Sequence, residues 1–438
     1  MKIVQVLQHF LPQQTAGTEV YTYALSKALL QQGHEVTVVI PGYGATATTQ
    51  YVYEGITVIQ YAEPSVVDRA LIMGERAPDG LTNFTAVIKN VSPDLVHFQA
   101  VGGSNGVGIL HVTAVHSMAI PIVTTLHLAG YSCISNNLLF KDAVVCDGII
   151  DVYKCSSCAL HQKGLRGAKL SMVHSLGTLM FKAGFNSIGW GNSLGTALAH
   201  PFLIQSLQHR LLQLAQMSSK LVVLTKWYQQ VLLQNGVAAS TLKLIQQGLP
   251  SSSSFTATRT HSTTLRLVFV GRIGASKGLH LLLKAMQTLP VGAVSLSVYG
   301  PETEPDYVAE CKEMAQHLPV TWGGIINAGA MVATLQAYDC LVLPSVICEM
   351  SPLVIQEAFA AGIPVIASNV YGNAEQITDG VNGWLFDFNS ATSLQQKIQL
   401  LIQTPALLET ARTQIPAVTH FETVAHQYQQ LYKSILAL

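Results

Sequence analysis

The stretch from residue 341 to residue 380 constrains the fold of this chain more than any other. It opens with the short apolar run Leu341–Leu343, which a proline ends, and it contains a second apolar run, PVIAS, at 364–368. Runs of this length between turn residues are typical of buried strands. The apolar segment between them is long enough for a helix. Strand, loop, helix and strand in this order predict a unit of a parallel sheet in an α/β fold.

Single residues predict the ends of the helix in this unit. Ser351 is a good N-cap, and Pro352 suits the first helical turn, where an N–H group would have no partner in any case. Gly362 is expected to end the helix, and Pro364 prevents its continuation.

Two carboxylates belong to this unit. Glu349 lies in the loop before the helix, and Glu357 lies on the apolar helix itself. A carboxylate on an apolar helix costs free energy unless it is paired or used. We therefore expect both to accept hydrogen bonds from hydroxyl groups, as on a sugar and a ribose. The N–H groups of Met350, Ser351 and Leu353 are expected to face the same place and to bind an anion or polar ligand.

Composition excludes several classes of function. The chain has 438 residues, a formal net charge of +0 and 11% charged residues. Nucleic acid is not expected as a partner, because binding along a phosphate backbone needs a basic surface. No apolar run is long enough to span a bilayer, and the first ten residues are typical of a strand and not of an export signal. We therefore expect a cytoplasmic protein with reduced cysteines.

The N-terminal residues predict half of a doubly wound sheet. Lys2–Leu7 and Val36–Ile40 are expected strands, and the helix between them ends at Gly33. Gly17 stands at the start of that helix. It either lets the backbone approach a diphosphate closely or makes a tight turn into the helix, and the sequence leaves both interpretations open.

Two histidines stand at the carboxyl ends of predicted strands of this half. His97 ends the run PDLVH, where we expect a core histidine with satisfied hydrogen bonds. His127 follows the run PIVTTL. Ligands bind beyond the carboxyl ends of parallel strands, so we predict a functional role for His127.

A second strand, loop and helix open at residue 265 and predict another doubly wound domain. Arg272 and Lys277 lie in its first loop. They are either a solvated charge pair or a clamp on a diphosphate, which needs fixed cationic donors. In a chain with so few charges we favour the clamp.

These elements divide the chain into parts. Residues 1–250 are expected to form the N-terminal domain, and residues 265–415 the C-terminal domain. The polar, unperiodic stretch 251–264 between them is the expected linker. Residues 416–438 are expected to form a last helix.

Four of the 7 cysteines, Cys133, Cys146, Cys155 and Cys158, fall within a loop-rich stretch at 128–160. Their number and the C-x2-C ending match the ligand count of a structural zinc site or an iron–sulfur cluster. The alternatives are small buried residues or two disulfides. We favour a metal that orders the loop, since a closed four-thiolate site has no open position for catalysis.

A helical segment at 164–215 follows. It could lie on a lipid surface as a peripheral membrane contact through Phe181, Phe185 and Trp190. It carries few basic residues, however. We therefore favour helices that pack over the sheet and line a cleft.

The C-terminal pattern resembles the E-x7-E signature of the retaining glycosyltransferases of the GT-B fold, in family 4 (group 1). Glu349 and Glu357 carry it, followed by A-x3-G-x-P-V-I-A-S. The loop with Arg272 and Lys277 is similar to the G-R-x4-K-G arrangement of this family. His127 stands where the family has its active-site histidine, and the resemblance covers nearly the whole chain.

The chain departs from the family pattern at four positions. These are Ala16, in place of a glycine beside Gly17, and Gln99, Leu128 and Gln247, in place of a histidine, an aspartate and an asparagine. The aspartate would have been available to assist the acceptor.

The resemblance implies two Rossmann-like domains facing each other across a cleft, and a C-terminal helix at 416–438 that crosses back to the N-terminal domain. It implies transfer of a sugar from a nucleoside-diphosphate sugar to a glycan or lipid-linked acceptor with retention of configuration, in polysaccharide or glycoconjugate synthesis. Arg272 and Lys277 would offset charge on the leaving diphosphate, and no divalent metal would be essential. Glu349 would hold sugar hydroxyls and Glu357 the ribose, while His127 would hold the sugar near its C6 hydroxyl.

Two other functions stay open. One is a non-catalytic nucleotide-sugar-binding partner or scaffold with the same fold. The other is an epimerase or a glycoside phosphorylase, and the phosphorylases usually need pyridoxal phosphate.

Overall fold

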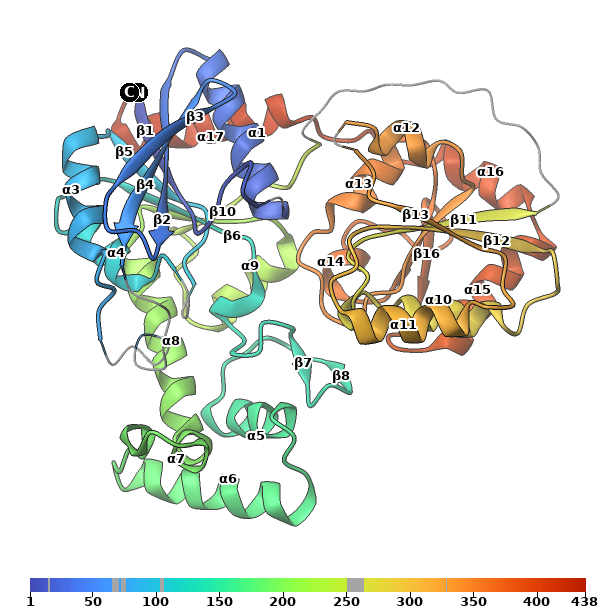
Figure 1. Ribbon diagram of the computed structural model, residues 1–438, viewed down its shortest axis with the longest axis horizontal. Helices are drawn as coiled ribbons and strands as arrows, with labels where there is room; N and C mark the ends of the chain where they lie inside the picture. The colour runs from blue at the N-terminus through green and yellow to red at the C-terminus, as the bar shows by residue number, and fades with distance from the viewer. Residues whose placement is uncertain (15, 65–70, 72–75, 103–105, 250–263, 328) are drawn as a thin grey trace. The chain divides into compact units, whose positions relative to one another are not determined.

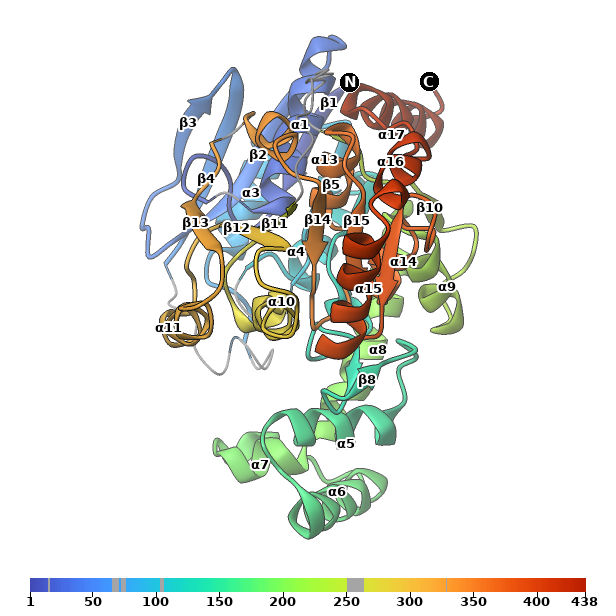
Figure 2. The same ribbon diagram turned by 90° about the vertical axis from the view of Figure 1, so that its right-hand side faces the viewer.

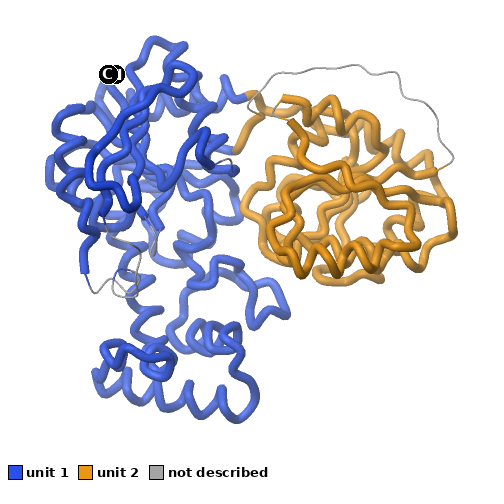
Figure 3. Tube along the Cα trace, in the orientation of Figure 1, with its two compact units in different colours: residues 1–246, 421–438 blue, residues 247–420 orange. Residues whose placement is uncertain are grey.

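The computed structural model describes residues 1–14, 16–64, 71, 76–102, 106–249, 264–327 and 329–438. The chain divides into two compact units, one of residues 1–246 and 421–438 and the other of residues 247–420 (Figure 3). Nearly all of the expected linker, 251–264, lies outside the described residues.

Eight of the described strands of the first unit form one sheet in the order β10-β9-β6-β5-β1-β2-β4-β3 (Figure 1). The strands β7 and β8 form a separate two-stranded hairpin. All neighbours in the large sheet are parallel except β3 and β4. The strands are β1 (Lys2–Val6), β2 (Glu35–Tyr43), β3 (Thr49–Tyr53), β4 (Ile56–Glu63), β5 (Leu95–Phe98), β6 (Ile122–Leu126), β7 (Leu139–Phe140), β8 (Val144–Val145), β9 (Lys220–Val223) and β10 (Leu242–Leu244).

The first unit contains both ends of the chain. Its described helices are α1 (Gly17–Gln31), α3 (Leu81–Val91), α4 (Ile109–His116), η1 (Ala129–Tyr131), α5 (Val152–Gln162), α6 (Gly167–Lys182), η2 (Ile188–Trp190), α7 (Ser193–Leu198), α8 (His200–Met217), α9 (Lys226–Gln234) and α17 (Phe421–Leu436). The apolar face of α17 packs on α1 and the sheet because Val424, Tyr428 and Leu431 recur at helical spacing. The hydroxyls of Tyr21 and Tyr428 are 2.9 Å apart in this core.

Helix α6 departs from the expectation that this segment covers the sheet. It packs on α5, α7 and α8 and lies away from the strands (Figures 1 and 2). The Phe181 ring packs edge-on against Phe202 of α8, with 4.8 Å between ring centroids. Phe181 is therefore part of the helical packing, which does not favour the alternative in which it contacts a lipid surface.

The described strands of the second unit form a six-stranded parallel sheet in the order β13-β12-β11-β14-β15-β16. The strands are β11 (Leu265–Val270), β12 (Val294–Tyr299), β13 (Val320–Gly324), β14 (Cys340–Leu343), β15 (Val365–Ser368) and β16 (Gly383–Phe386). The helices are η3 (Ala275–Lys277), α10 (Leu279–Met286), α11 (Pro305–Met314), α12 (Met331–Leu335), α13 (Leu353–Ala360), α14 (Tyr371–Ala374), α15 (Ala391–Gln403) and α16 (Ala406–Thr413).

Helices cover both faces of this sheet. Successive side chains of a strand point to opposite faces, so Leu267 and Phe269 pack with α10, α11 and α15, while Val268 and Val270 pack with α12 and α13. Figure 2 shows α10, α11 and α15 on one side of the sheet and α13 on the other. The sheet is therefore buried on both faces, as its nearly continuous apolar strands require.

The start of α13 differs slightly from the prediction. The helix begins at Leu353 with Pro352 as its N-cap, and no side chain caps it, so Ser351 does not have the predicted capping role. The proline has the extended backbone of a residue before a helix (ψ 119°). Gly362, with φ at +67°, follows the end of the helix as expected.

Candidate active site

The strand order of the second unit defines where a ligand can bind. Numbered in chain order, the strands run 3-2-1-4-5-6, so the direction of the connections reverses between β11 and β14. Ligands of such sheets bind beyond the carboxyl ends of the strands at this reversal. The loops that follow β11 and β14 contain Arg272, Lys277 and Glu349.

These two loops are in direct contact. Gly278 has φ at +69°, and a Cβ there would lie 1.9 Å from the carbonyl oxygen of Pro344, which follows β14. Only glycine therefore allows this approach. The N–H of Val346 donates to the carbonyl oxygen of Ser276 at 3.0 Å, which joins the loops a second time.

Lys277 and Glu349 form an ion pair across this junction. The Nζ of Lys277 donates to Oε1 of Glu349 at 2.6 Å, and the Ser345 hydroxyl donates to the same oxygen, also at 2.6 Å. The two charged side chains are 18% and 11% exposed, so the pair is largely shielded from water. Within the described residues, Oε2 of Glu349 accepts no hydrogen bond, and it can accept one from a ligand.

The position of the Glu349 loop depends on a second glycine. A Cβ on Gly372 would lie 2.0 Å from the Glu349 carbonyl oxygen. This close approach places the loop against α14. Met350, next in the loop, is buried, and Ser351 is half-buried. Leu353 opens α13, and the first N–H groups of a helix have no partner within the helix.

Arg272 lies in the same loop as Lys277 but differs in its surroundings. Its side chain is exposed, and it forms no ion pair with the residues that the structure describes. A guanidinium without a carboxylate partner can bind a phosphate through two parallel hydrogen bonds.

Glu357 lies one turn into α13. Burial raises the pKa of its carboxyl group to about 7. In the described part of the chain the carboxylate has no hydrogen-bond or ion-pair partner. A ligand hydroxyl would supply the missing hydrogen bond and thereby favour the ionised form.

His127 of the first unit lies beyond the carboxyl end of a strand, as predicted. His127 follows β6, and its Nε2 lies 2.9 Å from Oε1 of Gln99, which follows β5. The amide oxygen can only accept, so Nε2 carries the proton and Nδ1 is left as an acceptor. Burial lowers the pKa of His127 to about 3, and the ring is therefore neutral at physiological pH. It can bind a hydroxyl group but cannot exchange a proton near pH 7.

His97 is a core histidine, as expected. Its Nδ1 lies 2.6 Å from the Tyr432 hydroxyl and its Nε2 lies 2.7 Å from the Thr125 hydroxyl. Burial lowers the pKa of His97 well below its ordinary value. Gln99 contacts both histidines, which explains how this chain accommodates glutamine in place of the second histidine of the family pattern.

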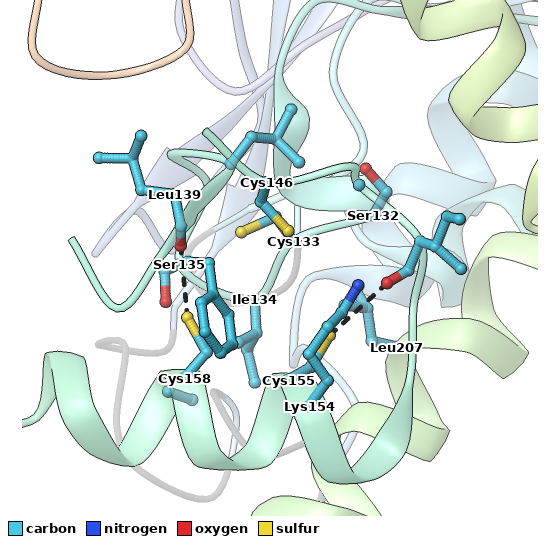
Figure 4. A pocket seen from close by; sticks show the side chains of 15 residues that line it. Ser132, Cys133, Ile134, Ser135, Leu139, Cys146, Lys154, Cys155, Cys158 and Leu207 are labelled. Atoms are coloured by element: carbon cyan, nitrogen blue, oxygen red, sulfur yellow. Dashed lines mark hydrogen bonds between the residues drawn. The ribbon is translucent and has the colours of Figure 1, made fainter. Parts of the chain in front are cut away.

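The four clustered cysteines line one hollow but do not form the predicted metal site (Figure 4). Among the described residues no group of three or more His, Cys, Asp or Glu side chains is arranged to hold a metal ion. Cys133 and Cys146 come from loops, whereas Cys155 and Cys158 lie one turn apart on α5 and donate to the carbonyl oxygens of Ile149 and Leu139.

The alternative of two disulfides is also wrong, because all seven cysteines are described and all are free. Burial raises the pKa of Cys155 to about 11 and also raises the pKa values of Cys146 and Cys158. These three side chains are therefore neutral thiols at physiological pH.

Three further residues contribute to these sites, although no role there was predicted for them from the sequence. Ser345 orients Glu349, and it is the serine of the S-x3-E-x7-E pattern that Glu349 and Glu357 complete. Gln99 orients His127. Glu19 is 6% exposed, burial raises its pKa, and its Oε2 has no partner among the described residues. With Gly17, Glu19 is kept from the GG-x-E-type element of the family that the sequence resembles, and this was the signal available.

Two family models match the chain. Residues 254–417 match the family described as "Glycosyl transferases group 1", and residues 15–175 match "Glycosyltransferase Family 4". The second unit therefore carries a group 1 glycosyltransferase domain. With two Rossmann-like α/β domains built on parallel sheets, the chain has the GT-B fold.

Individual proteins resemble this chain at low sequence identity. A glycogen synthase of Mycobacterium tuberculosis (strain ATCC 25618 / H37Rv) is 26% identical over 205 residues, which are 45% of this chain and 49% of the relative. The chain thus matches about half the length of that relative. A sucrose-phosphate synthase from Thermosynechococcus elongatus has a TM-score of 0.67 at 17% identity, covering 100% of this chain and 99% of its own.

HepE from Anabaena, solved in complex with UDP and glucose, has a TM-score of 0.64 at 16% identity, covering 99% of this chain and 100% of its own. At these identities the likeness to solved structures shows the fold. Among the described residues, no helix combines the length and apolar character needed to cross a bilayer.

Proposed function

We propose that this chain is a glycosyltransferase that moves a sugar from a nucleoside-diphosphate sugar to a glycan or lipid-linked acceptor with retention of configuration. The observation that carries the proposal is the junction of Lys277, Glu349 and Ser345 at the reversal point of the second sheet. It combines a cation, a carboxylate with a free oxygen and the start of a helix. A diphosphate and a sugar need these groups together.

The reaction requires stabilisation of a leaving group. The acceptor hydroxyl oxygen forms a bond to the anomeric carbon on the face that the diphosphate leaves, and the bond from that carbon to the phosphate oxygen breaks. The bonding pair departs with the diphosphate, whose oxygen takes the acceptor proton. Lys277 and Arg272 offset the charge that grows on the diphosphate. The chain needs no covalent nucleophile in this scheme.

The carboxylates and the neutral histidine position the donor. The free Oε2 of Glu349 accepts a hydrogen bond from a sugar hydroxyl, while Lys277 and Ser345 hold its other oxygen in place. Glu357 accepts hydrogen bonds from the ribose. His127 offers Nδ1 to a further sugar hydroxyl, because Gln99 occupies Nε2. The roles of these residues are part of the proposal.

The first experiment tests donor use without an acceptor. UDP-glucose is the first donor to try, since a structure of HepE was solved with it. ADP- and GDP-sugars follow. We expect slow release of the nucleoside diphosphate from one of them, with water taking the sugar. Once an acceptor is supplied, proton NMR of the glycoside formed should show the anomeric configuration of the donor. Binding without any release or transfer would favour the non-catalytic alternative.

A substitution at Gly17 tests whether the first unit takes part in donor binding. Gly17 opens α1, and a Cβ built on it meets no described atom within 4 Å. The fold therefore has room for a methyl group, and we assign that room to the donor diphosphate. Gly17→Ala should raise the donor KM about tenfold through misplacement of the donor, with an unchanged thermal midpoint.

Gly189→Ala is the matched control for this substitution, because a Cβ there also meets nothing within 4 Å. It should leave both the donor KM and the thermal midpoint unchanged. An unchanged donor KM in Gly17→Ala would assign that glycine to the turn alone.

A further inference from the structure

Helix α6 presents an apolar surface to solvent. Met172, Leu176 and Leu179 are 67%, 47% and 64% exposed. Their spacing of four and three residues places them on one face of the helix. Of the residues of α6, all of which the structure describes, Leu170 and Gly177 alone are buried. An exposed stripe of large apolar side chains is uncommon on the surface of a monomeric protein and indicates an interaction site.

The opposite side of α6 already has its packing partners. A Cβ on Gly177 would lie 2.7 Å from the Leu198 carbonyl oxygen, so α6 approaches the end of α7 closely there. Phe181 packs against Phe202 on the same inner side. The outer stripe is therefore not needed to hold the helix in place.

Further exposed apolar side chains follow the helix in the chain. Phe185 and Trp190 lie with their ring centroids 6.3 Å apart, and Leu194 of α7 is exposed as well. We call Met172, Leu176 and Leu179 the α6 apolar face.

The stretch of sequence that contains this face carries formal charges of one sign, although one of its lysines, Lys154, is paired with Asp147 outside the stretch. Residues 152–246 contain no aspartate or glutamate, although the whole chain has 24. The same stretch contains the lysines and arginines Lys154, Lys163, Arg166, Lys169, Lys182, Arg210, Lys220, Lys226 and Lys243. Lys169 and Lys182 are exposed and stand three residues before Met172 and three residues after Leu179, at the two ends of the stripe. The face is thus apolar at its centre and cationic at its ends.

We propose that the α6 apolar face docks on an anionic lipid surface. An interfacial helix inserts apolar side chains at the boundary between headgroups and acyl chains, and its lysines attract anionic lipids. A second copy of this chain is a poorer partner, because it would bring the same cations together with no carboxylate from this stretch to oppose them. The proposal concerns binding to a membrane and does not depend on the proposed transfer reaction.

Vesicle flotation of the full chain tests this. Vesicles of phosphatidylglycerol and phosphatidylcholine in equal parts should bind the protein, and phosphatidylcholine alone should bind it much more weakly. Combining Met172→Ser, Leu176→Ser and Leu179→Ser should reduce the partition coefficient by at least about tenfold, since three apolar side chains no longer enter the lipid. Lys169→Ala and Lys182→Ala should each reduce binding to the anionic vesicles about fivefold at low salt.

A matched control is Val52→Ser on β3, which removes an equally exposed apolar side chain elsewhere in the first unit and should not affect flotation. Thermal unfolding shows whether the triple variant is folded. Flotation that the triple substitution leaves unchanged would overturn the proposal. A second result would also overturn it. If the wild-type protein fails to float, and sedimentation shows a concentration-dependent dimer that the triple substitution abolishes, then a second copy of the chain covers this face.

Discussion

Replacing Lys277 with alanine should lower turnover by about 2–4 kcal/mol of transition-state free energy, a loss of roughly 30- to 1,000-fold. The Nζ of Lys277 is held by Glu349 at the point where the proposed diphosphate leaves, so its charge is already oriented. The effect should fall mainly on kcat, because the negative charge on the leaving group grows towards the transition state. Steady-state kinetics with the best donor measures both parameters.

Lys284→Ala is the matched control, since Lys284 is exposed on α10 of the same unit and should not affect turnover. Lys277→Ala also leaves the 11% exposed Glu349 without its cation, so a lower unfolding midpoint is expected. The combination of Lys277→Ala with Glu349→Gln should regain stability without regaining turnover. Wild-type turnover in Lys277→Ala would exclude the proposed role of this lysine.

Donor binding should depend on pH through Glu357. Its pKa is about 7 before the donor binds, because burial disfavours the charge. A carboxylate accepts hydrogen bonds from two ribose hydroxyls, whereas the protonated group is a poorer acceptor. Below pH 7 the affinity for a nucleoside-diphosphate sugar should therefore fall by up to about tenfold per pH unit. In Glu357→Gln the affinity should be lower at pH 8 and nearly independent of pH, which calorimetric titration can measure.

The same pKa shift predicts an effect on stability of the opposite sign. The ordinary pKa of a glutamate is 4.5, and the folded value is about 7, so the folded state binds the proton more tightly than the unfolded state. The ionised group therefore destabilises the fold fully above pH 7 and not at all below pH 4.5. Glu357→Gln should raise the free energy of unfolding by about 1–3 kcal/mol at pH 8 and hardly at all at pH 4.

A urea titration at both pH values measures this difference. Equal effects of Glu357→Gln at pH 8 and pH 4 would contradict the pKa assignment. Higher stability together with weaker donor binding would indicate that the carboxylate is kept for the ligand and not for the fold.

The predicted residues of the second unit could be identified because each lies at a boundary that the sequence marks. Arg272 and Lys277 follow one apolar strand, and Glu349 follows another. Their pairing could not be predicted from the local pattern. It depends on the order of strands that are far apart in the chain, and on Gly278, which allows the loops to touch.

The cysteines and α6 show where local pattern is insufficient. The spacing of Cys133, Cys146, Cys155 and Cys158 gives a ligand count but not the directions of the thiols, which two loops and α5 determine (Figure 4). Helix α6 has apolar residues on nearly every side, so no periodicity indicates which side is buried. That side follows from Gly177 and Phe181, whose partners lie on other helices.

The central claim is that cationic side chains at the reversal point of the second sheet bind the diphosphate of a donor. Calorimetric titration with a nucleoside diphosphate and with its parent nucleoside tests this claim without any acceptor. UDP, ADP and GDP are compared first, and the tightest binder is used. The wild type should bind the diphosphate at least about a hundredfold more tightly than the nucleoside, and this difference should disappear when Arg272→Ala and Lys277→Ala are combined. Equal affinities in the wild type, or a difference that survives both substitutions, would contradict the account.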